Sequence, residues 1–327
     1  MRQPGISHFG KTSDGRPVQV ATLSEGELTA SFLSWGAVIQ SVRLRGVPYD
    51  LTLGSENIAD YQGPMQYHGS LIGPVANRIT GATAQIGGVT YDFDKNLNDA
   101  LTLHSGSAGT QTKIWRLVEI TENTAAFALE LPDGEGGFPG NRRVLARFSL
   151  HPHAVMRMEV TVNTDKPTIL NLANHSYWNL DGTPDWSGHQ LQINSDRYLP
   201  TNADFAPTGE VIAVAGTDKD YRTPRQISPD TDPFDNNFCL SDTRRPLTDA
   251  LVLTGSSGVT MTVATTETGI QVYDGRNAIR PGQAAYEGLA IEAQSWPDAT
   301  NHSHFPSVVL QPEETYHQIT EWRFSQS

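Results

Sequence analysis

The sequence has a single cysteine and lacks any long apolar run. Cys239 is the one cysteine among 327 residues, so no disulfide can form within the chain and folding needs no oxidising compartment. We expect its thiol to be a small buried group between Phe238 and Leu240 rather than a nucleophile. No stretch approaches the roughly 18 apolar residues of a transmembrane helix, and the N-terminus lacks a signal-peptide core. These absences predict no membrane span and a cytoplasmic location.

Basic residues are also few. The chain has 23 Lys plus Arg against 36 Asp plus Glu, which gives a formal net charge of -13. Such a surface repels phosphate backbones and anionic lipids on average. We therefore expect neither a nucleic-acid nor a membrane partner. A neutral ligand fits this charge best, although one local basic pocket could still hold a phosphate.

Long amphipathic helical patterns are absent, and alternation with period two takes their place. Apolar and polar residues alternate over 156–162, 259–263 and 322–324, which is typical of half-buried antiparallel strands. The glycine-containing segments 87–88 and 255–258 each separate two such runs and predict hairpin loops. Because no repeat, linker or low-complexity segment interrupts the chain, we predict a single all-β domain over residues 1–327, a sandwich or barrel.

Several familiar functional motifs are incomplete or absent in this sequence. The glycine-rich segment 134–140 lacks the Lys-Ser/Thr of a P-loop and predicts a turn. His151 and His153 are expected on one strand face, and His302 and His304 form a similar pair, but neither pair has a third metal ligand nearby. We expect these histidines to be solvated or hydrogen-bonded. A serine hydrolase is disfavoured because no G-x-S-x-G elbow occurs.

Two polar clusters suggest a sugar site. The segment GPVANRI (73–79) precedes LHSG (103–106), and its Arg78 is compatible with a solvated surface or with a pocket that binds sugar oxygens. The segment NLANHSYWNL (171–180) gathers amides, a hydroxyl, His175 and two aromatic rings. Sugar sites need this combination, because hydroxyls pair with amides and the C–H face of a pyranose packs on an aromatic ring.

A third cluster contains a carboxylate after an apolar run. Glu292 follows residues 288–291 and is expected near a strand end. Partial desolvation there would raise its pKa toward the range of a general base. Taken alone, this segment slightly favours an exposed glutamate instead.

These clusters belong to a longer series of segments that resembles the aldose 1-epimerase (galactose mutarotase) family. The similarity runs over nearly the whole chain, which makes the match specific. The further matching segments are SWGA (34–37), Leu53-Gly54, Tyr61, DGEGGFPGN (133–141), FDNNF (234–238), EAQSWPDATNH (292–302) and Phe305-Pro306-Ser307.

The resemblance implies a large antiparallel β-sandwich whose open concave face holds the sugar without metal or cofactor. It also implies that His175 is the general acid and Glu292 the general base. The implied substrate-binding residues are Asn77, Arg78, His104, Asp235 and Gln271.

Three departures from the family pattern stand near these residues. The family more often has Arg at the position of Pro74 and Gly at that of Ser105, and residues 273–277 differ from the usual Tyr-Thr-Gly-Asn. We expect these positions at the rim of the pocket, where they would affect sugar preference rather than the reaction.

The function expected from the resemblance is interconversion of the α and β anomers of a free aldose, such as glucose or galactose, by a monomer or homodimer. Ring opening requires a proton to leave the C1 hydroxyl while another reaches the ring oxygen, and we expect the acid and the base on opposite sides of this unit. One alternative is an epimerase for hexose 6-phosphates, for which only Arg276 and Arg280 are nearby cations. Another is a non-catalytic sugar-binding module, which has little reason to keep both His175 and Glu292.

Overall fold

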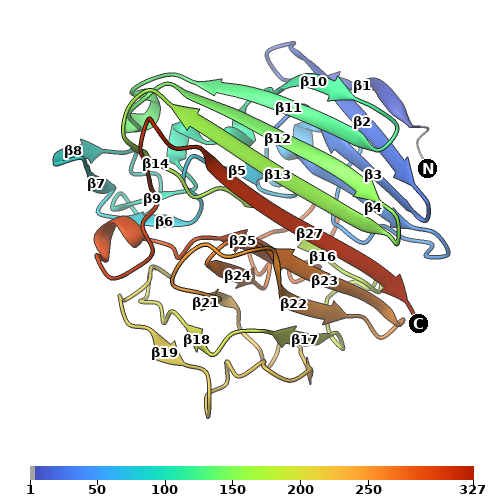
Figure 1. Cartoon of the computed structure of the whole chain (residues 1–327). Helices are drawn as coiled ribbons and strands as arrows, with labels where there is room; N and C mark the ends of the chain where they lie inside the picture. The colour runs from blue at the N-terminus through green and yellow to red at the C-terminus, as the bar shows by residue number, and fades with distance from the viewer. Residues whose placement is uncertain (1–3) are drawn as a thin grey trace.

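The computed structural model describes residues 4–327, and its regular secondary structure is almost entirely antiparallel strands (Figure 1). Its largest layer is a nine-stranded sheet. In spatial order this sheet contains β10 (Arg116–Ile120), β11 (Thr124–Leu131), β12 (Arg142–His151), β13 (Val155–Thr164), β27 (Tyr316–Gln326), β23 (Val259–Thr265), β22 (Thr248–Thr254), β17 (Gln190–Ile193) and β20 (Arg225–Gln226).

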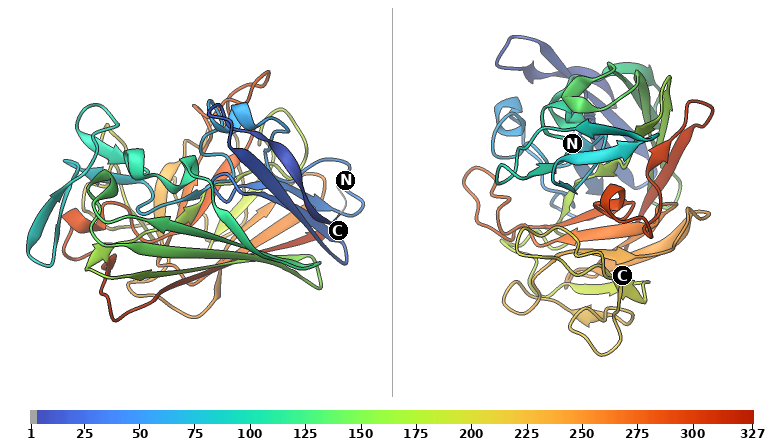
Figure 2. Two further views of the ribbon diagram at one scale, coloured as in Figure 1. Left: turned by 90° about the horizontal axis from the view of Figure 1, so that it is seen from above. Right: turned by 90° about the vertical axis from the view of Figure 1, so that its left-hand side faces the viewer.

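Two smaller sheets pack against one face of this layer (Figure 2). The first contains β1 (Gly5–Lys11), β2 (Pro17–Glu25), β3 (Leu28–Leu33) and β4 (Ile39–Leu44). The second has the order β16 (Tyr177–Trp178), β25 (Leu289–Gln294), β24 (Gly269–Tyr273), β21 (Asp235–Cys239), β18 (Arg197–Tyr198) and β19 (Ile212–Ala213).

Aromatic contacts join the layers. The ring of Phe32 in β3 stacks on Phe148 in β12 with centroids 4.5 Å apart, and Trp178 in β16 packs on Trp322 in β27 at 6.1 Å. One hydrophobic core draws side chains from all three sheets. The predicted all-β antiparallel sandwich is therefore confirmed.

Short elements connect the sheets. Two-stranded ladders pair β5 (Leu71–Ile72) with β15 (Ala173–Asn174), β6 (Arg78–Thr80) with β9 (Leu101–Leu103), β7 (Thr83–Ile86) with β8 (Val89–Asp92), and β14 (Thr168–Ile169) with β26 (Val309–Leu310). The helical turns are α1 (Ile58–Tyr61), η1 (Gly106–Ala108), η2 (Thr110–Thr112), η3 (Glu135–Gly137) and η4 (Ala299–Asn301). Within residues 4–327, no helix has the length and apolarity needed to cross a membrane.

The alternating segments behave as predicted. Residues 156–162, 259–263 and 322–324 lie in β13, β23 and β27, and their apolar members are buried. Segments 87–88 and 255–258 form the hairpin loops between β7 and β8 and between β22 and β23. Cys239 is buried in β21, and the glycine-rich segment 134–140 is a turn that contains η3.

One prediction about the paired histidines is wrong. His151 ends β12 and hydrogen-bonds Ser149 (2.9 Å), whereas His153 lies in the following turn with a positive φ of 67°. The two rings therefore do not share a strand face. The rings of His302 and His304 both pack on Phe305, and His304 Nε2 hydrogen-bonds Gly209 O (2.8 Å). In the described part of the chain, no group of three or more His, Cys, Asp or Glu side chains is arranged to hold a metal ion.

Strand alternation determines which side chains leave the core of the six-stranded sheet. Ile270 and Ile291 belong to the shared core, so their neighbours Gln271 and Glu292 face the opposite side. Gln271 is opposite Glu292 in the register of β24 and β25. Asp235 in β21 is opposite Tyr273, two residues along β24 from Gln271, and therefore faces the same side. This outer face carries the polar site.

Candidate active site

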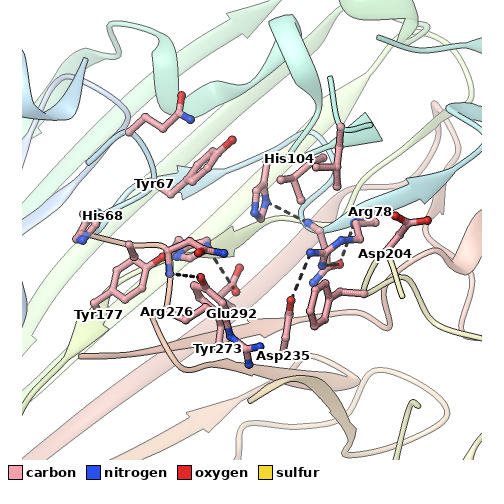
Figure 3. Close-up of a pocket in the computed structure, with 18 of the residues that line it drawn as sticks. Tyr67, His68, Arg78, His104, Tyr177, Asp204, Asp235, Tyr273, Arg276 and Glu292 are labelled. Atoms are coloured by element: carbon pink, nitrogen blue, oxygen red, sulfur yellow. Dashed lines mark hydrogen bonds and ion pairs between the residues drawn. The ribbon is translucent and has the colours of Figure 1, made fainter. Parts of the chain in front are cut away.

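A cavity of about 460 Å³ opens on the outer face of the six-stranded sheet (Figure 3). Its walls come from loop segments 63–68, 97–98, 203–205 and 276–278, which are far apart in sequence. Six of the seven predicted site residues line it, namely Asn77, Arg78, His104, His175, Asp235 and Glu292. The fold thus brings the sequence-predicted residues together.

His175 and Glu292 form a buried pair in this cavity. The backbone N–H of His175 donates to Ser70 O (2.9 Å) and its carbonyl accepts from Gly69 N (3.0 Å), which fixes the residue beside β15. Its Nε2 lies 3.5 Å from Glu292 Oε1. The interpretation of Glu292 as an exposed strand-end residue is wrong, because it lies inside β25 and is only 2% exposed.

Two atoms of the pair have no protein partner. Among residues 4–327, His175 Nδ1 and Glu292 Oε2 are buried and accept or donate no hydrogen bond. Buried polar atoms are almost always paired in native proteins, and exceptions mark places where a ligand or water completes the bonding. The unpaired oxygen of Glu292 is therefore available to a substrate hydroxyl.

Burial shapes the protonation of both groups. It raises the pKa of Glu292 to about 8, an effect that Asp235 reinforces and Arg78 opposes. It lowers the pKa of His175 to about 4. Both shifts favour the neutral forms, so at neutral pH the pair holds one exchangeable proton between the carboxyl oxygen and the imidazole nitrogen.

His104 is held as a neutral hydrogen-bond donor. The backbone N–H of Asn77 donates to its Nδ1 (3.1 Å), so the neutral ring carries its proton on Nε2. Burial, followed by electrostatic interaction with His175 and Arg78, lowers the pKa of His104 well below its usual range. The ring is therefore able to donate a hydrogen bond to a sugar oxygen without carrying charge.

Arg78 and Asp235 form the polar end of the cavity. Arg78 Nη2 lies 3.3 Å from Asp235 Oδ2, and its Nη1 donates to Asn77 Oδ1 (3.3 Å). The side chain of Arg78 is only 12% exposed, which decides against a solvated surface arginine. Burial raises the pKa of Asp235, while Arg78 opposes this shift.

Gln271 differs from the other six predicted residues because it does not line the cavity. Its Nε2 donates to Asp235 Oδ1 at 2.7 Å, so it supports the carboxylate from beneath. The family-based expectation placed it against the substrate. In this chain Gln271 contacts Asp235, which itself lines the cavity.

Two of the three departures do not lie at the rim as expected. Ser105 is buried, and its Oγ accepts from Val75 N (2.8 Å) and donates to Val75 O (2.9 Å), which ties segment 103–106 to segment 73–79. Pro74 also lies outside the cavity lining. Only the 273–277 segment reaches the cavity, through Tyr273, Arg276 and Asn277.

Sequence reasoning missed most of the aromatic wall. The ring centroid of Tyr67 lies 4.7 Å from that of His104 and 5.8 Å from that of His175, and Tyr177 approaches His175 at 5.1 Å. His68 and Phe205 also line the cavity. Except for Tyr177, these residues lie in loops without a periodic pattern, and no signal in the sequence connects them to the site.

Comparison with known proteins finds relatives over nearly the whole chain. The family model described as aldose 1-epimerase matches residues 19–323. Galactose mutarotase from Bos taurus is 32% identical over 325 residues, covering 94% of each chain. Aldose 1-epimerase from Escherichia coli K12 is 30% identical over 339 residues, covering 95% of this chain and 96% of its own.

A solved structure shows the same architecture. Galactose 1-epimerase from Lactobacillus acidophilus NCFM superimposes with a TM-score of 0.86 at 25% identity, and the match covers 99% of both chains. An aldose epimerase homologue from Caenorhabditis elegans also gives 0.86, at 26% identity, with 94% of this chain and 98% of its own covered. The chain belongs to the aldose 1-epimerase family and is an isomerase that interconverts the anomers of an aldose.

Proposed function

We propose that the substrate is a free, unphosphorylated aldohexose and that Glu292 and His175 open and close its ring as general base and general acid. The observation that carries this proposal is the buried pair itself, with Nε2 and Oε1 3.5 Å apart at the cavity and Oε2 unpaired. An acid and a base in contact, with shifted pKa values and a cavity in front of them, are the groups that this reaction needs.

The reaction is a proton exchange at one carbon of the sugar. Glu292 removes the proton of the C1 hydroxyl while His175 protonates the ring oxygen, and the bond between C1 and the ring oxygen breaks to give the open-chain aldehyde. Rotation about C1–C2 presents the other face of the carbonyl. On closure His175 takes the proton of the C5 hydroxyl and Glu292 returns its proton to the carbonyl oxygen, so the enzyme is regenerated.

We propose that the pair approaches the C1–O5 unit from one side, which differs from the expected placement on opposite sides of this unit. His175 and Glu292 lie side by side. This placement suits the chemistry, because the C1 hydroxyl and the ring oxygen are bonded to the same carbon. The resting pair is a protonated Glu292 beside a neutral His175, and the reactive pair is a Glu292 carboxylate beside a protonated His175. Both pairs hold the same number of protons, so transfer of one proton from Glu292 to His175 prepares catalysis without exchange with solvent.

The remaining predicted residues are proposed to hold the sugar. Arg78 and Asp235 present charged donors and acceptors to the hydroxyls at one end of the cavity, and His104 offers its Nε2 proton. Asn77 positions both Arg78 and His104, and Gln271 holds Asp235. We propose that these contacts fix the ring oxygen and the C1 hydroxyl at the acid–base pair.

The structure favours a neutral sugar over a sugar phosphate. Arg276 binds the Asp274 carboxylate through Nε (2.9 Å) and Nη2 (2.5 Å), so its charge is already compensated. Arg280 pairs with Glu287 and donates to Gly54 O, and neither it nor its partners line the cavity. Neither of the two arginines considered for phosphate binding is thus a free cation facing the substrate.

Polarimetry of freshly dissolved α-glucose, α-galactose and a pentose tests the proposal, with the spontaneous rate subtracted. We expect accelerated approach to the equilibrium rotation, and we expect glucose 6-phosphate to compete poorly with glucose. A protein that binds sugar but leaves the rate unchanged would instead be a non-catalytic module. The cytoplasmic location and the monomeric or homodimeric state stay predictions.

A further inference from the structure

Phe205 is an unusual residue at the mouth of the cavity. It lines the cavity, yet its side chain is 39% exposed, one of the few large hydrophobic side chains that the fold leaves in contact with solvent. Its backbone has a positive φ of 59°, a conformation that is uncommon for a bulky residue. Both features cost stability, which points to a role outside the folded core.

A local hydrogen-bond network imposes this conformation. The side-chain oxygen of Asn202 accepts from Asp204 N (2.9 Å) and from Ala206 N (3.1 Å), while Phe205 N donates to Asn202 O (3.0 Å). Asn98, from another loop of the cavity wall, donates to Asp204 Oδ1 (2.8 Å). The turn is thus fixed on both sides, and it presents the Phe205 ring in a defined place.

Two guanidinium groups position the ring further. The Cζ atoms of Arg78 and Arg276 each lie 5.6 Å from the Phe205 ring centroid. At this distance a guanidinium is attracted to the quadrupole of an aromatic ring. Since Arg78 also contacts Asp235, the ring is adjacent to the groups proposed to hold the sugar hydroxyls.

The place of this ring relative to the acid–base pair follows from the arrangement of the cavity. Figure 3 shows Tyr177 and His68 at one end, Arg78 and Asp204 at the other, and Glu292 between them. The charged donors and acceptors for hydroxyls lie on the Arg78 side, so the sugar extends that way from Glu292. In a pyranose ring, C4 is directly across from C1 and C3 across from the ring oxygen.

We propose that Phe205 is a specificity-determining residue that packs on the C3–C4 edge of the sugar and discriminates the configuration at C4. Inversion at C4 exchanges a hydrogen for a hydroxyl on each face of the sugar, and an aromatic ring packs well on C–H bonds but leaves a hydroxyl without a hydrogen-bond partner. This inference rests on the proposed function, since it takes C1 to be at Glu292 and His175.

The test compares Phe205→Ala, Phe205→Tyr and wild type on glucose and galactose, which differ only at C4. We expect wild type to prefer one epimer and Phe205→Ala to bring the ratio of the two kcat/KM values about three- to tenfold closer to one. The change should appear mainly in KM, because the acid–base pair is untouched. Phe205→Tyr keeps the ring and should keep the wild-type ratio.

A matched control is Val89→Ala, which truncates another exposed apolar side chain outside the cavity and should leave both sugars unaffected. Equal losses for both sugars in Phe205→Ala would show that the ring only supports Arg78, and would overturn the inference. An unchanged ratio, or a wild-type enzyme without preference, would overturn it too. By contrast, wild type without any mutarotation would contradict the proposed function itself.

Discussion

Replacing Glu292 with glutamine is expected to stabilise the folded protein at neutral pH while it removes most of the catalytic activity. Glu292 is 2% exposed, and burial raises its pKa from the ordinary value of 4.5 to about 8. The folded state therefore keeps this proton up to a higher pH than the unfolded state. Stability from this group is fully present below pH 4.5 and is lost as the pH rises toward 8.

The size of the effect follows from this difference. At pH 7, which is about 2.5 units above the pKa of 4.5 in the unfolded chain, ionisation of Glu292 stabilises the unfolded state. At about 1.4 kcal/mol per unit, this stabilisation is roughly 3 kcal/mol. Glutamine is never ionised, so its variant does not lose this stability. Coupling to His175 and Asp235 reduces the figure, and we expect a gain of about 1–3 kcal/mol at pH 7 and almost none near pH 4.5.

Urea unfolding of wild type and Glu292→Gln between pH 4.5 and pH 8 measures this difference, with polarimetry on the same samples. A suitable control is Glu119→Gln, because Glu119 is 37% exposed in a surface ion pair, a contact that contributes little to stability. The kcat of Glu292→Gln should fall by roughly 10²–10⁴. If the variant is no more stable relative to wild type at pH 7 than at pH 4.5, Glu292 is ionised in the folded enzyme and the reasoning fails.

The other predictions concern the same site and its support. Because the pair must hold one proton, kcat/KM should fall below about pH 4, where His175 gains a second proton, and above about pH 8, where Glu292 loses its own; a flat pH profile would contradict the pair. Polarimetry of folded His175→Asn should show kcat lowered by roughly 10²–10⁴, and the double variant with Glu292→Gln should be little slower than either single one. Arg78→Lys should reduce kcat/KM with the circular dichroism spectrum unchanged, since lysine lacks the planar donor fork, and unaltered kinetics would remove Arg78 from the site. Ser105→Ala leaves Val75 N–H without its partner and should lower the unfolding free energy by about 1–3 kcal/mol in urea titrations, a loss absent if water replaces the hydroxyl.

The sequence by itself determined the fold class, and its resemblance to the family indicated six of the residues that line the cavity. The period-two pattern predicts β13, β23 and β27 because a strand sends alternate side chains to opposite faces whatever else surrounds it. The resemblance identified Asn77, Arg78, His104, His175, Asp235 and Glu292, and the fold collects all six in one cavity.

Only the tertiary structure decided the environment of each residue. Glu292 is buried in a cavity whose walls include loops distant in sequence, and the side-by-side placement of His175 depends on backbone contacts with Gly69 and Ser70. Gln271 hydrogen-bonds Asp235 and does not line the cavity, and Ser105 is buried rather than at the rim. The local sequence pattern predicts which face of a strand a side chain occupies. The pKa values, the hydrogen-bond partners and the position of Phe205 at the cavity mouth depend instead on segments that are distant in sequence. These segments come together only when the sheets pack.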